Sequence, residues 1–190
     1  MPRTYLPKAS TIPLSSDDEA DRLARTPYRQ AVGSLLYVMV CTRPDIAYAV
    51  QAVSQHITTF RHIHREAVKR IFTYLKATQE YSLCLGGNAP IQLSVQADAD
   101  WASDPADRKS ITGYFLSLNG GAFAWKLKKQ SLRSSSTTEA ECVSHWSASQ
   151  VAEHFNVLLS EWASRTSFPF LLVRTARVPS LSAPLLDQSH

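Results

Sequence analysis

The sequence predicts an α/β protein in which a small helical region precedes three antiparallel strands and one long helix. Three observations support this prediction. Apolar residues recur every three or four positions up to about residue 85, they alternate with polar residues from residue 91 onward, and a cluster of Ser and Thr then opens a second, longer helical pattern. With 190 residues, of which 44% are hydrophobic and 19% charged, the chain has the composition of a globular protein.

The helical region is predicted at residues 27–85, after a lead-in of residues 1–26 that is rich in Pro, Ser and Asp and is expected to be flexible. The second of its helices follows Thr42, which is placed to cap it, and carries Pro44 in its first turn. The apolar faces of the first two helices consist of Val32, Leu35, Leu36 and Met39, and of Ile46, Val50 and Val53.

A third helix, from about residue 62 to residue 78, has a basic outward face with Arg65, Lys69 and Arg70. A second group of cations consists of Lys126, Lys128 and Lys129. The formal net charge of +4 suits a nucleic-acid partner. Basic faces of this kind are nevertheless more often solvated surfaces than binding sites, so charge alone decides little.

The strands are predicted from alternation and turn residues. IQLSVQAD places Ile91, Leu93 and Val95 on one face of a half-buried strand, and the segments SITGYFLSL and GAFAWKLKK follow on either side of Asn119-Gly120, a strong hairpin signal. This unit is predicted at residues 90–162. Its helix can be capped by Thr137 or Thr138, and its buried face is marked by Val151, Phe155 and Leu158.

The remaining segment, residues 163–190, shows no sustained period, and we expect no packed element there. The three cysteines lie far apart without a CxxC pair, which is typical of reduced thiols in an intracellular protein, cytoplasmic or nuclear. Neither a signal peptide nor a membrane-spanning stretch is evident, so no membrane partner is expected.

Two carboxylates are the candidate catalytic and metal-binding residues: Asp98, at the end of the first strand, and Glu141, in the first turn of the long helix. Further acids near Asp98 are Asp100, Asp104 and Asp107. Carboxylates gathered at a strand end can hold Mg²⁺ or Mn²⁺ for phosphodiester hydrolysis. From spacing alone, however, an ordinary solvated loop and a helix whose N-terminus favours acidic residues explain these carboxylates better than a metal site does.

A family resemblance changes that balance. The strings YRQAVGSLLYVMVCTRPDIAYAV, HREAVKRIFTYLKAT, ADADWASDPADRKSITGYFLSLNGGAFAWKLKKQ and SSSTTEAE closely resemble, in order and spacing, the copia-type retrotransposon Pol polyproteins. The resemblance covers residues 28–161. It implies the end of a reverse transcriptase with its connection region, followed by the N-terminal half of an RNase H domain.

The resemblance implies a truncated form of the family's RNase H-like fold. In the family, this fold cuts RNA in RNA–DNA hybrids with two divalent metal ions. The family's first-strand aspartate matches Asp98, and the second acid of its TEAE motif matches Glu141, whereas Asp100 and Glu139 are neighbours that could be mistaken for them. Positions expected to be structural are Ser110, Thr112, Gly113 and Trp125.

The resemblance stops at Glu161. If the codons of EWASR and RTARVPSLSA are re-read with one extra base after that glutamate, codon choices exist that give the family's Glu-Leu-Gly-Leu-Pro turn and a motif Asp-Ser-Gln-Gly-Ala-Ile-Ala-Leu. We therefore expect a frameshifted tail without the third metal aspartate, Asp187 being a poor substitute. The expected consequences are an inactive or impaired enzyme and an unpaired strand edge open to self-association. The alternative is a non-catalytic protein that binds nucleic acid, or one that the host has adopted for interactions.

Overall fold

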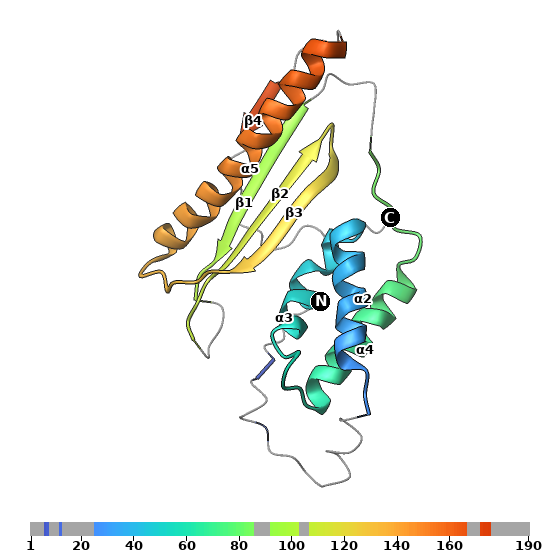
Figure 1. The fold of residues 1–190 in the computed structure, drawn as a ribbon. Helices are drawn as coiled ribbons and strands as arrows, with labels where there is room; N and C mark the ends of the chain where they lie inside the picture. The colour runs from blue at the N-terminus through green and yellow to red at the C-terminus, as the bar shows by residue number, and fades with distance from the viewer. Residues whose placement is uncertain are drawn as a thin grey trace. The chain divides into compact units, whose positions relative to one another are not determined.

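The structure is a computed structural model, and it describes residues 6–7, 12, 25–85, 92–102, 107–166 and 172–175. The chain divides into two compact units, Met1–Ser82 and Leu83–His190, each of which is described by itself (Figure 1). Asp104, Asp187 and most of the predicted lead-in lie outside the described residues.

The first unit is helical, as predicted. Its elements are α2 (Tyr28–Cys41), the 3₁₀-helix η2 (Pro44–Ile46), α3 (Ala47–Ser54) and α4 (His62–Ala77). The buried core is formed by Tyr28, Val32, Leu35, Ile46, Val50, Val53, Val68 and Ile71. These residues recur at helical spacing, so each helix turns one apolar face inward.

Tyr28 is the largest fully buried side chain of this core. Its ring stacks on Phe60 with centroids 4.4 Å apart, and its hydroxyl donates a 2.8 Å hydrogen bond to the carbonyl oxygen of Val53. Burial raises the pKa of Tyr28 to about 12. The phenol therefore stays neutral and holds the start of α2 against the end of α3.

One prediction about the helical region needs correction. Thr42 does not cap the second helix, because its hydroxyl donates to the carbonyl of Val38 and closes α2 instead. The lead-in also contacts the unit at two points: Pro7 accepts a hydrogen bond from His64, and Ile12 accepts one from Arg61. The lead-in is thus anchored at these two described residues.

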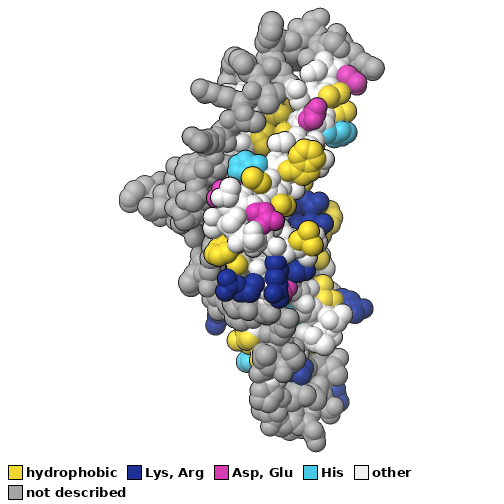
Figure 2. All heavy atoms as spheres, turned by 90° about the vertical axis from the view of Figure 1, so that its left-hand side faces the viewer, with side chains coloured by type: hydrophobic (Ala, Val, Ile, Leu, Met, Phe, Trp, Pro, Cys, Tyr) yellow, Lys and Arg dark blue, Asp and Glu magenta, His cyan; other side chains and the backbone are white. Residues whose placement is uncertain are grey.

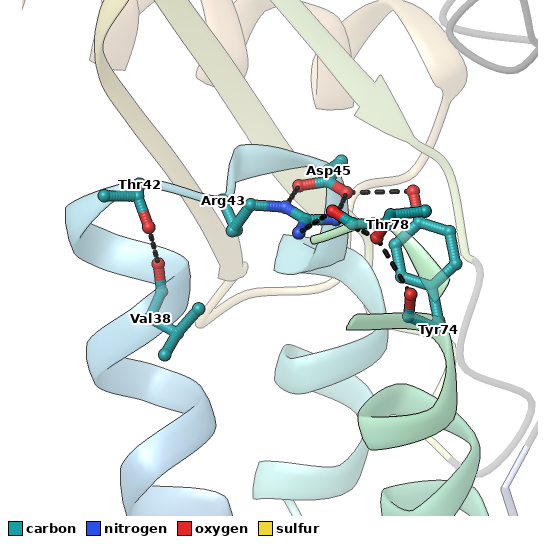
Figure 3. Close-up of polar contacts among 6 residues, drawn as sticks. All are labelled: Val38, Thr42, Arg43, Asp45, Tyr74 and Thr78. Carbon is teal, nitrogen blue, oxygen red and sulfur yellow. Dashed lines mark hydrogen bonds and ion pairs between the residues drawn. The ribbon is translucent and has the colours of Figure 1, made fainter. Parts of the chain in front are cut away.

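Arg43 connects the start of η2 to the end of α4 (Figure 3). Its guanidinium makes a bidentate pair with Asp45 at 2.9 and 2.7 Å and donates to both the carbonyl and the hydroxyl oxygen of Thr78. Tyr74 also donates to Asp45, at 2.9 Å. Burial raises the pKa of Asp45, but the bonds from Arg43 and Tyr74 outweigh it and hold that pKa below its ordinary value.

The second unit contains a sheet in the strand order β3-β2-β1-β4. The strands β1 (Gln92–Asp100), β2 (Ile111–Leu118) and β3 (Gly121–Lys129) pair antiparallel, as predicted. The turn between β2 and β3 has positive φ at both central residues, 51° at Asn119 and 82° at Gly120. Asn and Gly tolerate this conformation, which explains why the pair is a reliable hairpin signal.

The fourth strand, β4 (Leu172–Thr175), was not predicted. It pairs in parallel with Gln92–Val95 of β1, so the expectation of three strands and of a tail without packed elements is wrong for these residues. The predicted open edge of β1 is correspondingly shorter. Within the described residues, β4 leaves only the second half of β1, from Gln96 to Asp100, without a partner on that side.

The long helix α5 (Thr137–Thr166) packs on one face of this sheet. Its buried core residues, Ala148 and Ala152, meet Leu93, Val95, Ala97 and Leu116, with Val151, Phe155 and Leu159 alongside. Leu158, predicted to be buried, is 45% exposed, because the inward position one residue later is taken by Leu159. No described helix is both long and apolar enough to cross a membrane.

The Arg43–Asp45 pair is expected to stabilise the first unit. Replacing Arg43 by Met leaves a partly exposed carboxylate with fewer donors, so the free energy of unfolding should fall by about 2 kcal/mol. The double variant R43M/D45N should lose clearly less than the sum of the two single variants. Hydrogen exchange of α4 measures this, and strict additivity of the three losses would contradict the pairing.

The first unit should also lose stability on acidification. His64 is fully buried, its Nδ1 accepts the N–H of Arg61 and its Nε2 donates to Pro7. Burial, aided by the Arg61 charge, holds the pKa of His64 below its ordinary value of 6.5 despite the Pro7 bond. The unfolded chain therefore takes up a proton that the folded chain refuses, and stability falls as the pH drops below 6.5.

Hydrogen exchange of α4 at pH 7.5 and 5.5, corrected for intrinsic rates, checks this second expectation. Protection should decrease at the lower pH, and by less in the variant H64Q. The ring of His56 lies 4.0 Å from that of His64, so H56Q is included to separate the two contributions. The exposed His145 provides the control H145Q. An equal loss of protection in H64Q and in the parent chain would refute the assignment.

Candidate functional site

Asp98 lies in β1 opposite Gly113 of β2. Successive residues of a strand point to opposite faces, so its side chain is on the face away from Leu93, Val95 and Ala97, which pack against α5. It is half-buried. A Cβ added to Gly113 would approach Leu127 to 3.3 Å, in keeping with the predicted close-packing role of that glycine.

Among the described residues, no strand pairs with β1 beside Asp98 on the side of β4. The last residue pair of β1 and β4 is Val95 with Thr175, three residues before Asp98. Because β1 and β4 are parallel, their carboxyl ends point the same way. Crevices beyond the carboxyl ends of parallel strands are where open α/β sheets bind ligands. Asp98 therefore lies at a favourable place for a site.

Ser144 brings α5 to the same place. Its hydroxyl is fully buried and lies 2.5 Å from the carbonyl oxygen of Asp98 and 3.2 Å from that of Gly113. Glu141 precedes Ser144 by one helical turn and is exposed. The helix turn that carries Glu141 is thus fixed beside the backbone of Asp98.

Glu139 has a different role from Glu141. Its N–H donates to the hydroxyl oxygen of Ser136, while its carboxylate accepts hydrogen bonds from the N–H and the hydroxyl of Ser135. These bonds from Ser135 hold the pKa of Glu139 below its ordinary value. Ser136, rather than the predicted Thr137 or Thr138, therefore caps α5, and Glu139 is occupied by the helix start.

Gln130 ties the sheet to the start of α5. Its buried amide nitrogen donates to the hydroxyl of Thr112 at 2.9 Å and to the carbonyl of Ala140 at 3.1 Å, and its amide oxygen accepts from Ser134. Its backbone N–H donates to Ser110. Ser110 and Thr112 are thus structural, as predicted.

The other acids of the loop between β1 and β2 are less available. Asp107 pairs with Lys129 at 2.8 Å and accepts from the N–H of Lys109. Burial raises the pKa of Asp107, but these partners hold it below its ordinary value. Asp100 ends β1 next to this loop and is half-buried.

The donor atoms at Asp98 and Glu141 are hard carboxylate oxygens, the kind that Mg²⁺ and Mn²⁺ prefer. Mg²⁺ usually keeps several waters and needs only one or two protein carboxylates. Each carboxylate therefore fits such an ion in kind, but the alternation of β1 places the Asp98 side chain on the face away from α5, which carries Glu141, so the described residues do not bring the two together. Within the described residues, no three His, Cys, Asp or Glu side chains are close enough together to hold a metal ion.

Sequence reasoning missed Ser144 and Gln130, the two buried polar residues that position this site. A signal for Ser144 was present. The helix buries small residues at a spacing of four, namely Ala140, Ser144, Ala148 and Ala152. Such a stripe indicates close approach of the helix to a sheet, whereas the prediction relied on the larger apolar residues.

Several known proteins are similar to this chain. It is 49% identical over 126 residues to the retrovirus-related Pol polyprotein from transposon TNT 1-94 of Nicotiana tabacum, and 38% identical over 144 residues to that from transposon RE1 of Arabidopsis thaliana. It is also 41% identical over 130 residues to the secreted RxLR effector protein 161 of Plasmopara viticola, of which it covers 92%. Over about two thirds of its length the chain is thus homologous to copia-type, retrovirus-related Pol polyproteins of plant transposons.

The matched regions cover 66% and 76% of this chain but only 9% and 10% of the tobacco and Arabidopsis polyproteins. The chain is thus related to a small part of a Pol polyprotein, which is consistent with a polyprotein fragment. No protein-family model matches the chain, and no solved structure matches it. The activity of the whole polyproteins therefore enters only as a proposal.

The Ser144 hydroxyl is expected to hold α5 in place. In the variant S144A the free energy of unfolding of the second unit should fall by about 1 kcal/mol, the usual cost of one lost buried hydrogen bond. The exposed Ser149 of the same helix bonds only to the carbonyl of His145 and serves as the matched control, S149A. Urea unfolding measures both variants, and equal losses would contradict a special role for Ser144.

Proposed function

We propose that this chain is a Pol fragment whose second unit derives from an RNase H domain, the part of Pol that cleaves RNA in RNA–DNA hybrids. The supporting observation is the bond between Ser144 and the carbonyl of Asp98, which joins the Glu141 turn of α5 to the open end of β1. The similarity to Pol polyproteins over about two thirds of the chain and the order of the motifs in the sequence agree with it. The first unit then corresponds to the end of the reverse transcriptase and its connection region.

In this proposal Asp98 and Glu141 would hold a divalent cation, Mg²⁺ or Mn²⁺. When bound, such an ion activates water and stabilises the leaving oxygen in phosphodiester hydrolysis. The protein's own contribution is to fix the two carboxylates. Asp98 is held by the β1–β2 pairing and Glu141 by the helix start that Gln130 and Ser144 anchor.

We propose further that hydrolysis is impaired or absent in the chain as it stands. Two metal ions about 4 Å apart need more carboxylate oxygens than two residues supply. After Asp107, the acidic residues in the sequence are Glu139, which binds Ser135, then Glu141, Glu153, Glu161 and Asp187. None of these follows β4 closely, since the residues directly after Thr175 are Ala, Arg and Val.

A cleavage assay tests the proposal. A labelled RNA–DNA hybrid is incubated with the protein and Mg²⁺ or Mn²⁺, alongside D98N, E141Q and, as a matched control, E139Q. We expect no cleavage, or a trace that D98N and E141Q abolish and that E139Q leaves in place. The positive control is the protein translated from a coding sequence with one base inserted after the Glu161 codon. This protein should gain metal-dependent cleavage. A strong activity insensitive to D98N and E141Q would overturn the proposal.

The alternative is a non-catalytic protein that binds nucleic acid or serves the host as an interaction protein. The finding that favours it is that no described group of three potential ligands is positioned for a metal ion. If the frame-restored chain cleaves hybrids and the present chain only binds them, this alternative describes the molecule as it exists. Its descent from an RNase H domain would then still hold.

A further inference from the structure

A groove of about 410 Å³ lies between α5 and the outer part of the sheet, away from Asp98. Its walls come from β2 and β3 on one side and from the flank of α5 on the other. Its lining includes Tyr114, Lys126, Lys128, Ser147 and Gln150.

The strand pairing explains why the two lysines stand in the groove. Leu116 of β2 packs in the core with α5, so residues of β2 at the same parity face the helix. Lys126 is paired with Tyr114, and Lys128 with Thr112. Directly opposed residues share a face, so both lysines lie on the helix side of the edge strand, beyond the part that α5 covers.

Lys126 and Lys128 give the groove positive charge, and Glu139 is the one acidic residue among its described lining residues. Lys126 and Lys128 are exposed, and neither forms an ion pair with a described acidic residue. The third lysine of the cluster, Lys129, is neutralised by Asp107. Glu139 also lines the groove; its carboxylate accepts two hydrogen bonds from Ser135 and keeps its negative charge, so it offsets one of the two lysines and leaves a net positive groove. Figure 2, which faces this side of the unit, shows Lys and Arg side chains gathered next to the helix surface.

The groove also offers contacts of a second kind, from Tyr114 of β2 and from the flank of α5. Tyr114 is half-buried and lies beside Lys126, so part of its ring faces the groove. The helix contributes the hydroxyl of Ser147 and the amide of Gln150, which can bond to sugar or base edges. Cations along a groove together with an aromatic side chain are how proteins bind single-stranded nucleic acid without strict sequence preference.

We propose that this groove binds single-stranded nucleic acid, with phosphates at Lys126 and Lys128 and one base against Tyr114. The inference rests on the proposed function for the class of partner, but it concerns a surface separate from the two carboxylates. A duplex fits less well, because its stacked bases cannot reach a recessed aromatic ring. In a Pol fragment this surface would hold an unpaired stretch of template.

Binding in the absence of metal tests the inference independently of cleavage. Fluorescence anisotropy of a labelled twelve-nucleotide oligo-dT and oligo-U is followed in EDTA as the salt concentration rises. For K126Q/K128Q we expect roughly tenfold weaker binding at 50 mM salt and a slope of log K against log salt that is flatter by about 1.4, because each phosphate contact on a single strand contributes about 0.7.

Tyr114 separates stacking from charge. Y114L should weaken binding several-fold without changing the salt slope, whereas Y114F should bind like the parent chain. The matched control for charge is K69Q/R70Q, which removes two exposed cations from α4 and should change neither affinity nor slope. Circular dichroism of each variant confirms that it is folded.

Three results would overturn the inference: unchanged binding in folded K126Q/K128Q, a larger loss in K69Q/R70Q, or competition by poly-glutamate as effective as by oligo-dT with Y114L unaffected. The last would indicate a general anionic surface for an acidic peptide instead. Because no metal is present, failure of the cleavage assay leaves this result intact, and failure here leaves the assignment of Asp98 and Glu141 intact.

Discussion

The second unit depends on how closely α5 approaches the sheet. The helix presents Ala140, Ser144, Ala148 and Ala152 to β1 and β2, and small side chains allow its backbone near the strands. Close approach buries backbone and side-chain polar groups, which must then find partners. Ser144 and Gln130 supply them, at the carbonyls of Asp98 and Gly113 and at Thr112 and Ala140. The candidate site exists because these bonds fix one end of the helix.

The first unit also has buried polar groups that need partners, and there a charged side chain supplies the hydrogen bonds. Arg43 lies between the end of α2 and the start of η2. Its guanidinium donates hydrogen bonds both to Asp45 and to the carbonyl of Thr78 at the end of α4. A bidentate pair fixes both distance and orientation, which apolar packing alone does less sharply. The rings of Tyr74 and Tyr81 flank the guanidinium at 5.6 and 5.7 Å. In both units, buried polar groups set the geometry that the apolar cores stabilise.

The sequence predicted elements whose own residues determine them. The positive φ values of Asn119 and Gly120 are local properties, and the bounds of α2 and α4 follow from their apolar faces. Residues defined by partners were missed. Gln130 carries no periodic signature of burial, and Ser136 caps α5 beside two threonines that look equally able. Ser144 belongs to a stripe of small residues, a weaker signal than the larger apolar residues on which the prediction relied. The four residues of β4 form a strand only because β1 offers an edge.

That short strand bears on how the site and the fold are related. In the re-reading of the tail with one added base, the aspartate codon takes the last base of the Arg174 codon and the first two of the Thr175 codon. Thr175 ends β4 and pairs with Val95, three residues before Asp98. If the second unit derives from an RNase H domain, the aspartate of the re-read tail would therefore fall directly after β4, toward the Asp98 end of β1. A lost base would then remove a third carboxylate while Leu172–Thr175 still pair with β1, so a metal site would be lost before the sheet.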